Sequence, residues 1–150
     1  MRLQRDSFSC GVAVIINAIL CFGKIVSEKQ VRKFSNTTKE LGTDEKGILN
    51  ALKHLGFRGE EYYLSKNWTE DALYEALSFG WPVIICVDNL DHWCCVIGHM
   101  ANKYVVFDSL NSKSNKKENG TYVLTPNQLR KRWKSKDDGS YYAIVVKKSS

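Results

Sequence analysis

Apolar residues in the first half of the chain recur at the spacing of a helix. Residues 12–20 are almost all apolar and are followed by Gly23, and a second apolar stripe joins Ile48, Leu52 and Leu55. Residues three, four and seven positions apart lie on one face of a helix, so both stretches predict buried helices. We expect four helices in this half: residues 10–22, a short helix opened by Ser27, a helix from Thr43 or Asp44 to about Leu55, and residues 67–80.

After Pro82 the pattern changes to that of strands. Apolar runs at residues 83–87, 92–98 and 103–108 are separated by turn-forming segments at 89–91 and 101–102, and such short connections join antiparallel neighbours. We further expect strands at residues 60–64, 121–124 and 141–147, an exposed polar loop at 109–119, a turn at 136–140 and a helix from Pro126 through Trp133.

This order of elements predicts an α+β fold, with N-terminal helices packed on a C-terminal antiparallel sheet. The chain of 150 residues is expected to be a single domain over residues 1–150.

The composition is that of an ordinary globular protein, with 43% apolar and 25% charged residues. There is no run of eighteen or more apolar residues, so no membrane span is expected. The net charge of +6 comes partly from basic clusters at residues 113–117, 130–136 and 147–148. Such clusters can attract nucleic acid, acidic membranes or acidic peptides. Because no nucleic-acid-binding motif accompanies them, a solvated surface is the favoured interpretation, and no nucleic-acid partner is expected.

The five cysteines are an odd number, which argues against a framework of disulfides. No two of them have the spacing of zinc ligands, so neither a metal nor another cofactor is expected. Cys94 and Cys95 would face opposite sides of a strand, and with Cys21 and Cys86 we expect them to pack in the core. One reactive thiol, Cys10, in a reducing compartment fits this pattern. The expected location is the cytoplasm, or secretion as an effector without a recognisable signal peptide.

Cys10 has the surroundings of a nucleophile. It stands where the apolar helix begins, and the positive end of a helix dipole lowers the pKa of a thiol. Gly11 beside it would let a substrate approach closely. A thiolate also needs a base and a group that orients the base. His92 begins one expected strand and Asp108 ends the next, so antiparallel pairing would make them neighbours. We therefore expect Cys10, His92 and Asp108 to act as nucleophile, base and orienting carboxylate.

Other residues could fill two of these places. His54 falls inside an expected helix and His99 just beyond the end of an expected strand, so His92 is preferred as the base. Asp91 and Asn111 are the rivals for the third place. Because Asp91 is adjacent to His92 on an extended chain, its side chain should point away from the imidazole.

The order of these residues resembles that of the papain-like cysteine peptidases. Four stretches carry the resemblance: residues 4–19, 41–57, 82–98 and 105–108. Within that group the chain is most similar to the bacteriocin-processing peptidases, which cut leader peptides after a double glycine. The resemblance implies a papain-like fold and a cysteine peptidase that acts on a peptide or protein. It also implies an oxyanion site, formed by the side-chain amide of Gln4 and the backbone amide of Cys10.

The sequence departs from the family pattern in two places. Ser109 stands where the family has a proline, and Cys94 and Cys95 stand where it has aliphatic residues. Related transporters carry such a domain fused to membrane and ATPase parts. Neither part is visible here, so we expect a standalone or excised domain.

Two alternatives to a peptidase stay open. The same thiol machinery serves glutamine deamidation and acyl transfer, as in a secreted effector, because the fold does not decide the acceptor. A catalytically inactive domain that binds a peptide in the cleft is the other alternative, and the presence of all four site residues argues against it. Nothing in the sequence points to an oligomeric state.

Overall fold

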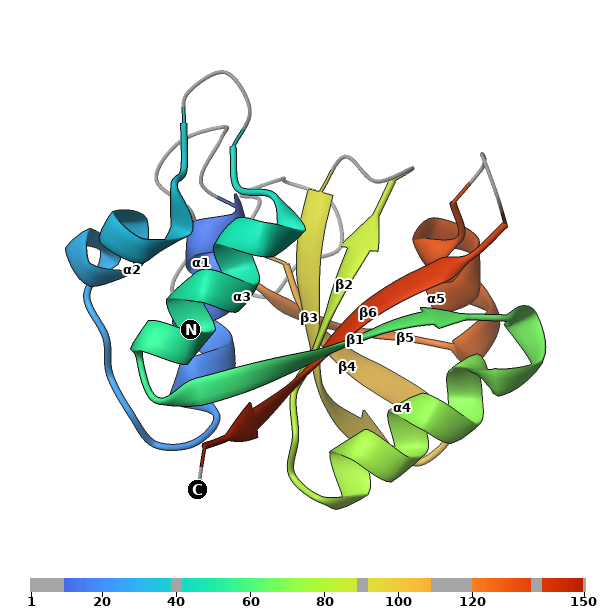
Figure 1. The fold of residues 1–150 in the computed structure, drawn as a ribbon. Coiled ribbons are helices and arrows are strands. Elements are labelled where there is room, and N and C mark those ends of the chain that lie inside the picture. Colours follow the sequence, from blue (N-terminus) through green and yellow to red (C-terminus); the bar gives the residue numbers. More distant parts are fainter. Residues whose placement is uncertain (1–9, 39–41, 89–91, 109–119, 136–138, 150) are drawn as a thin grey trace.

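The structure, a computed structural model, describes residues 10–38, 42–88, 92–108, 120–135 and 139–149 (Figure 1). Their elements are, in order, α1 (Cys10–Leu20), α2 (Glu28–Ser35), α3 (Glu45–His54), β1 (Phe57–Leu64), the short 3-10 helix η1 (Lys66–Trp68), α4 (Thr69–Ser78), β2 (Val83–Val87), β3 (His92–Met100), β4 (Lys103–Phe107), β5 (Thr121–Leu124), α5 (Pro126–Trp133) and β6 (Tyr141–Lys148). The segments 89–91 and 109–119, and most of the turn expected at 136–140, lie outside the described residues.

Local side chains explain where several helices begin and end. The Ser27 hydroxyl accepts a hydrogen bond at the start of α2, as part of a capping box. At α3 the cap is Asp44 rather than Thr43. Gly23 and Gly56 follow α1 and α3 with φ angles of 80° and 92°. Glycine adopts this left-handed backbone without steric cost. Helix α3 stops about where the sequence indicates, whereas α1 ends at Leu20, two residues before the expected end.

The six strands form one antiparallel sheet in the order β1-β6-β2-β3-β4-β5. The last strand, β6, therefore lies between β1 and β2. In the β3–β4 ladder Cys95 pairs with Phe107. Extending this register by one residue sets Cys94 opposite Asp108, with His92 two residues further along on the same face.

Helices cover both faces of the sheet. The core with α1, α2 and α3 lies on one face, and the core with α4 and α5 lies on the other (Figure 1). Strand β2 shows the division, because Ile84 and Cys86 belong to the first core and Val83, Ile85 and Val87 to the second. The α+β class is confirmed. The first three helices pack on the sheet as expected, and α4 and α5 add a third layer.

Two strands extend at least two residues beyond their expected bounds. Strand β1 begins at Phe57, and β3 continues to Met100. The expectation that His99 lies beyond the strand end is therefore wrong, because His99 pairs with Tyr104 in the ladder. The strand can continue because Ala101, with a φ of 55°, makes a tight turn into β4. Among the described helices, none is long and apolar enough to cross a membrane.

Candidate active site

Cys10 is the first residue of α1 and is only half-buried, while the next nine residues of the helix are buried. Gly11 packs directly against Thr43, since a Cβ built on Gly11 would lie 2.5 Å from the Thr43 Cβ. Gly11 therefore also has a packing role, which the sequence did not indicate. The Thr43 carbonyl also accepts a hydrogen bond of 2.8 Å from the indole N–H of Trp93. These contacts fix the start of α1 against the start of β3.

His92 and Asp108 lie together, as the strand order indicated. The His92 Nε2 atom is 2.7 Å from Asp108 Oδ1, and both side chains are buried. With Nε2 engaged by the carboxylate, Nδ1 is the ring nitrogen left for Cys10, whose pKa the His92 ring lowers. Three elements distant in sequence, α1, β3 and the end of β4, thus bring a thiol, an imidazole and a carboxylate into one line of contacts.

The surroundings of Cys10 and His92 move their pKa values in opposite directions. Burial raises the pKa of the Cys10 thiol, but the hydrogen bond with His92 and the backbone N–H of Trp93 outweigh it, so the pKa is lowered. Burial lowers the pKa of His92, but the hydrogen bonds to Asp108 and Cys10 outweigh it, so that pKa is raised. Both directions favour a thiolate beside an imidazolium, the reactive form of a cysteine nucleophile.

The second carboxylate oxygen of Asp108 is also engaged. The hydroxyl of Tyr122, on β5, donates to Oδ2 at 3.2 Å, and the Arg132 guanidinium, on α5, lies 3.6 Å from the same oxygen. Arg132 also donates to the Tyr122 hydroxyl. Sequence reasoning did not single out these two residues. Arg132 stood only in a basic cluster, and no local pattern links Tyr122 to a carboxylate fourteen residues earlier.

Cys94 lies beside this line of contacts. It is fully buried, which raises its pKa, and its sulfur lies within 4.8 Å of a ring nitrogen of His92. Within the described residues, His92, Cys94 and Asp108 are the one group of metal-type donors, with ligand atoms within 4.8 Å of one another. However, His92 and Asp108 are hydrogen-bonded to each other, and the Arg132 guanidinium lies beside the Asp108 carboxylate. The atoms that a metal ion would need are already engaged, so this group does not fit a metal centre.

The remaining cysteines agree with the sequence expectation, with one exception. Cys86, Cys94 and Cys95 are buried, and Cys94 and Cys95 face opposite cores as expected. Cys21 is exposed, so its expected role in core packing is wrong. It follows the last residue of α1, and its thiol donates to the Asn17 carbonyl at 3.4 Å.

The other histidines have partners of their own. His54 ends α3 and stacks on Phe34, with ring centroids 4.5 Å apart. His99 contacts the rings of Tyr74 and Tyr104. The three remaining candidates, Gln4, Asp91 and Asn111, lie outside the described residues.

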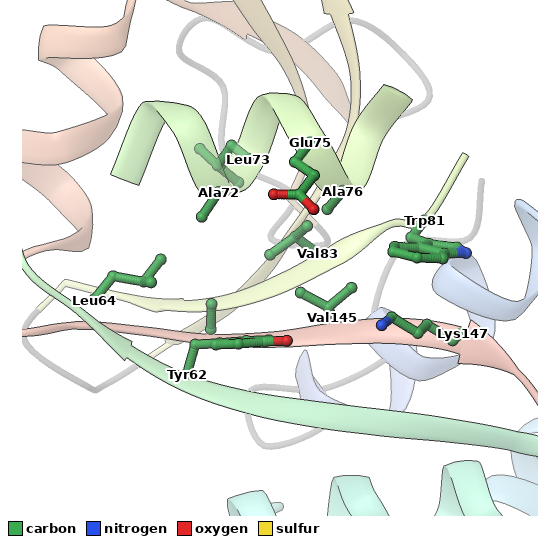
Figure 2. A pocket seen from close by; sticks show the side chains of 11 residues that line it. Tyr62, Leu64, Ala72, Leu73, Glu75, Ala76, Trp81, Val83, Val145 and Lys147 are labelled. Carbon is green, nitrogen blue, oxygen red and sulfur yellow. The ribbon is translucent and has the colours of Figure 1, made fainter. Parts of the chain in front are cut away.

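A pocket of about 140 Å³ lies between α4 and the strands β1, β6 and β2. Figure 2 shows Glu75 reaching into it from the helix, with the Trp81 ring beside Lys147 at one end. The Lys147 ammonium is 4.1 Å from the centre of that ring, a cation–π contact. The elements that form the pocket differ from those that carry Cys10, His92 and Asp108, so it is distinct from the candidate active site.

An α+β domain that sets a helix-start cysteine against a histidine–carboxylate pair has the architecture of a papain-like cysteine peptidase. The sequence profile of the peptidase C39 family matches residues 1–148, so the chain belongs to that family and is a cysteine peptidase. A comparison with curated protein sequences found no match.

Solved structures of peptidase domains have the same fold. The peptidase domain of Streptococcus ComA, a bifunctional ABC transporter involved in a quorum-sensing pathway, is 24% identical, with a TM-score of 0.75 over 99% of this chain and 97% of that one. The peptidase domain of Streptococcus mutans ComA is 23% identical, with a TM-score of 0.66 over 97% of each chain. A double glycine motif protease from an AMS/PCAT transporter, solved in complex with the leader peptide, is 16% identical, with a TM-score of 0.67 over 98% of this chain and 89% of that one.

Proposed function

We propose that this peptidase cleaves a leader peptide after a double glycine, with Cys10 as nucleophile, His92 as acid and base, Asp108 as the orienting carboxylate and Gln4 as an oxyanion donor. The observation that carries the proposal is that His92 lies between two partners, Asp108 and Cys10. One of its ring nitrogens lies 2.7 Å from Asp108 Oδ1, and the ring is close enough to Cys10 to lower the pKa of the thiol. A histidine with a carboxylate on one ring nitrogen and a thiol beside the other side of the ring is placed to exchange a proton with that thiol.

The chemistry follows from these positions. The Cys10 thiolate attacks the scissile carbonyl carbon, and the carbonyl π electrons move to the oxygen. When the tetrahedral intermediate collapses, the C–N bond breaks and the His92 imidazolium gives its proton to the leaving amine. His92, now neutral, takes a proton from a water that attacks the thioester. When this second tetrahedral intermediate collapses, the C–S bond breaks and the carboxylic acid is released. The Cys10 thiolate and the His92 imidazolium are then restored.

The oxyanion needs donors on the opposite side of the carbonyl from His92. The first N–H groups of a helix have no partner within the helix, so the backbone amide of Cys10 at the start of α1 is suited to this role. The side-chain amide of Gln4 is proposed as the second donor. Its position six residues before Cys10 and the family resemblance support that assignment.

A leader peptide is the proposed substrate because it is bound in the solved complex of the double glycine motif protease, which shares this fold. Glycine suits a narrow cleft beside a nucleophile, since it has no Cβ and lets the backbone approach closely.

The test is mass spectrometry of the purified protein with two sets of peptides, one with a Gly-Gly pair before the cleavage position and one with Ala-Ala in its place. Cleavage after Gly-Gly that disappears in Cys10→Ala is the expected result. A one-dalton gain on glutamine without cleavage would show a deamidase, and transfer of the acyl group to an added amine would show an acyltransferase. Rapid labelling of the thiol with none of these products would refute the proposed substrate.

A further inference from the structure

A second line of contacts continues from Asp108 away from the catalytic pair. Tyr122 donates to Asp108 Oδ2 at 3.2 Å, and Arg132 lies 3.6 Å from that oxygen while donating to the Tyr122 hydroxyl. The guanidinium of Arg132 is in turn held by Asp88, with distances of 3.0 Å from Nη2 to Oδ2 and 3.3 Å from Nε to Oδ1. The line therefore runs from the catalytic pair through two side chains to the end of β2.

Arg132 is fixed through its main chain as well as its side chain. The backbone N–H of Asp88 donates to the Arg132 carbonyl at 2.9 Å. A fork-shaped contact between guanidinium and carboxylate fixes direction as well as distance. Helix α5 is thus attached to the end of the sheet where His92 and Asp108 lie. The position of the guanidinium beside Asp108 follows from this attachment.

A carboxylate buried as deeply as Asp108, with 3% of its surface exposed, is stable as an anion only where donors or cations surround it. The described ionisable groups that face the site from each packed element are Cys10 on α1, Cys86 on β2, Asp88 after β2, His92 and Cys94 on β3, Tyr122 on β5 and Arg132 on α5. Of these groups, Arg132 is the one that carries a positive charge at every working pH.

We propose that Arg132, together with Tyr122, is a positioning residue that keeps Asp108 ionised and turned toward His92. The inference rests on the catalytic roles proposed above. Tyr122 and Arg132 occupy Oδ2 as donors and leave Oδ1 for the imidazole. The pair thus determines which oxygen meets His92 and keeps the negative charge that supports the imidazolium.

The experiment measures the alkylation rate of Cys10 by iodoacetamide against pH, alongside peptide turnover, in Arg132→Gln, Arg132→Lys and Tyr122→Phe. Arg130→Gln is the matched control, because Arg130 lies on the same helix and forms an ion pair with Glu70 on α4, outside the line of contacts. Circular dichroism and urea unfolding establish that each variant is folded. Alkylation needs no peptide, so this readout does not depend on the substrate proposed above.

In Arg132→Gln the acid limb of the alkylation profile should move up by about one pH unit, the low end of the effect of removing an opposite charge, because the change reaches Cys10 through Asp108 and His92. The direction is upward because the lost cation favoured the Asp108 carboxylate, which supports the His92 imidazolium beside the Cys10 thiolate. Turnover should fall roughly tenfold or more, because the loss impairs the general acid–base step carried out by His92. Arg132→Lys should restore the acid limb but not the full turnover, since lysine returns the charge without the fork. Tyr122→Phe should lower turnover with a smaller movement of the limb.

Several outcomes overturn the inference. It fails if Arg132→Gln moves the limb no more than Arg130→Gln does, or if Arg132→Gln and Tyr122→Phe both keep the wild-type profile and turnover. If Arg132→Gln does not fold, Tyr122→Phe alone decides. A wild-type protein in which Cys10 labels no faster than a free thiol refutes both the triad and this inference. Fast labelling without peptide cleavage refutes only the proposed substrate.

Discussion

Replacing Asp108 by asparagine tests the tautomer of His92. Tyr122 accepts a hydrogen bond from Arg132 and gives its own proton to Asp108 Oδ2, and Arg132 can only donate. In Asp108→Asn, Tyr122 and Arg132 would therefore hold the amide oxygen at the position that Oδ2 now occupies. The amide NH₂ group would then point at His92 Nε2, where the carboxylate oxygen now lies at 2.7 Å.

An NH₂ group in that place reverses the roles of the imidazole nitrogens. Nε2 would have to accept, so the proton of the neutral ring would move to Nδ1, the nitrogen that faces Cys10. That nitrogen could then no longer take the proton of the thiol. The variant also loses a buried negative charge, whose removal typically changes the pKa of a partner by about 1–3 units, or about 1.4–4 kcal/mol of support for the imidazolium. We expect turnover to fall by roughly 10²–10⁴.

The assay combines turnover with the pH profile of Cys10 alkylation, using Cys10→Ala to subtract labelling of other thiols. Because the His92 imidazolium supports the Cys10 thiolate, the inflection of the alkylation profile should move to higher pH in both Asp108→Asn and Asp108→Ala. The two variants should lose turnover to a similar extent, although asparagine keeps the size and polarity of the side chain. Turnover of Asp108→Asn within tenfold of wild type would refute the tautomer argument. If Asp108→Ala keeps both properties, the third member lies elsewhere, and Asn111 is the next candidate.

Three further predictions concern single residues. His92→Ala should abolish turnover, whereas His99→Ala should stay within a few-fold of wild type; equal losses in a peptide assay would show that the base is misassigned. Gln4→Ala should leave iodoacetamide labelling nearly intact but lower turnover roughly a hundredfold or more; normal turnover would remove it from the oxyanion site. Gly11→Ala should destabilise the fold by about 1–3 kcal/mol in urea unfolding, because its Cβ would meet Thr43 at 2.5 Å; an unchanged midpoint would contradict the packing role.

Most of the elements could be predicted from the sequence because local signals determine them. Ser27 caps a helix through its own hydroxyl, and Gly56 ends one through its left-handed backbone. The strand β5 and the helix α5 have the bounds that the pattern gives, since Pro126 opens that helix. The neighbouring positions of His92 and Asp108 followed from strand order alone, because a tight connection leaves antiparallel pairing as the simple arrangement.

The errors concern properties that depend on contacts between distant segments. Gly11 reads as a substrate-facing residue next to a nucleophile, and only the three-dimensional structure shows Thr43 packed against it. Cys21 reads as part of an apolar run, but it follows the end of α1 and is exposed. His99 was placed outside its strand because the polar residues after residue 98 resemble a turn, whereas pairing with Tyr104 extends the ladder.

The position of Arg132 shows that a sequence motif does not identify every residue on which a site depends. Cys10, His92 and Asp108 can be found by residue type and order, because thiol chemistry requires those groups. A buried carboxylate also requires something to keep it charged, and sequence order does not say which cation will do so. Here the answer depends on α5 packing across the end of β2, where Asp88 holds the guanidinium next to Asp108. A search for the three proposed catalytic residues alone would therefore accept a chain in which the helix carries glutamine at this position. Under the proposal for Arg132, such a chain keeps Cys10, His92 and Asp108, but its acid limb lies at higher pH and its turnover is lower by roughly tenfold or more.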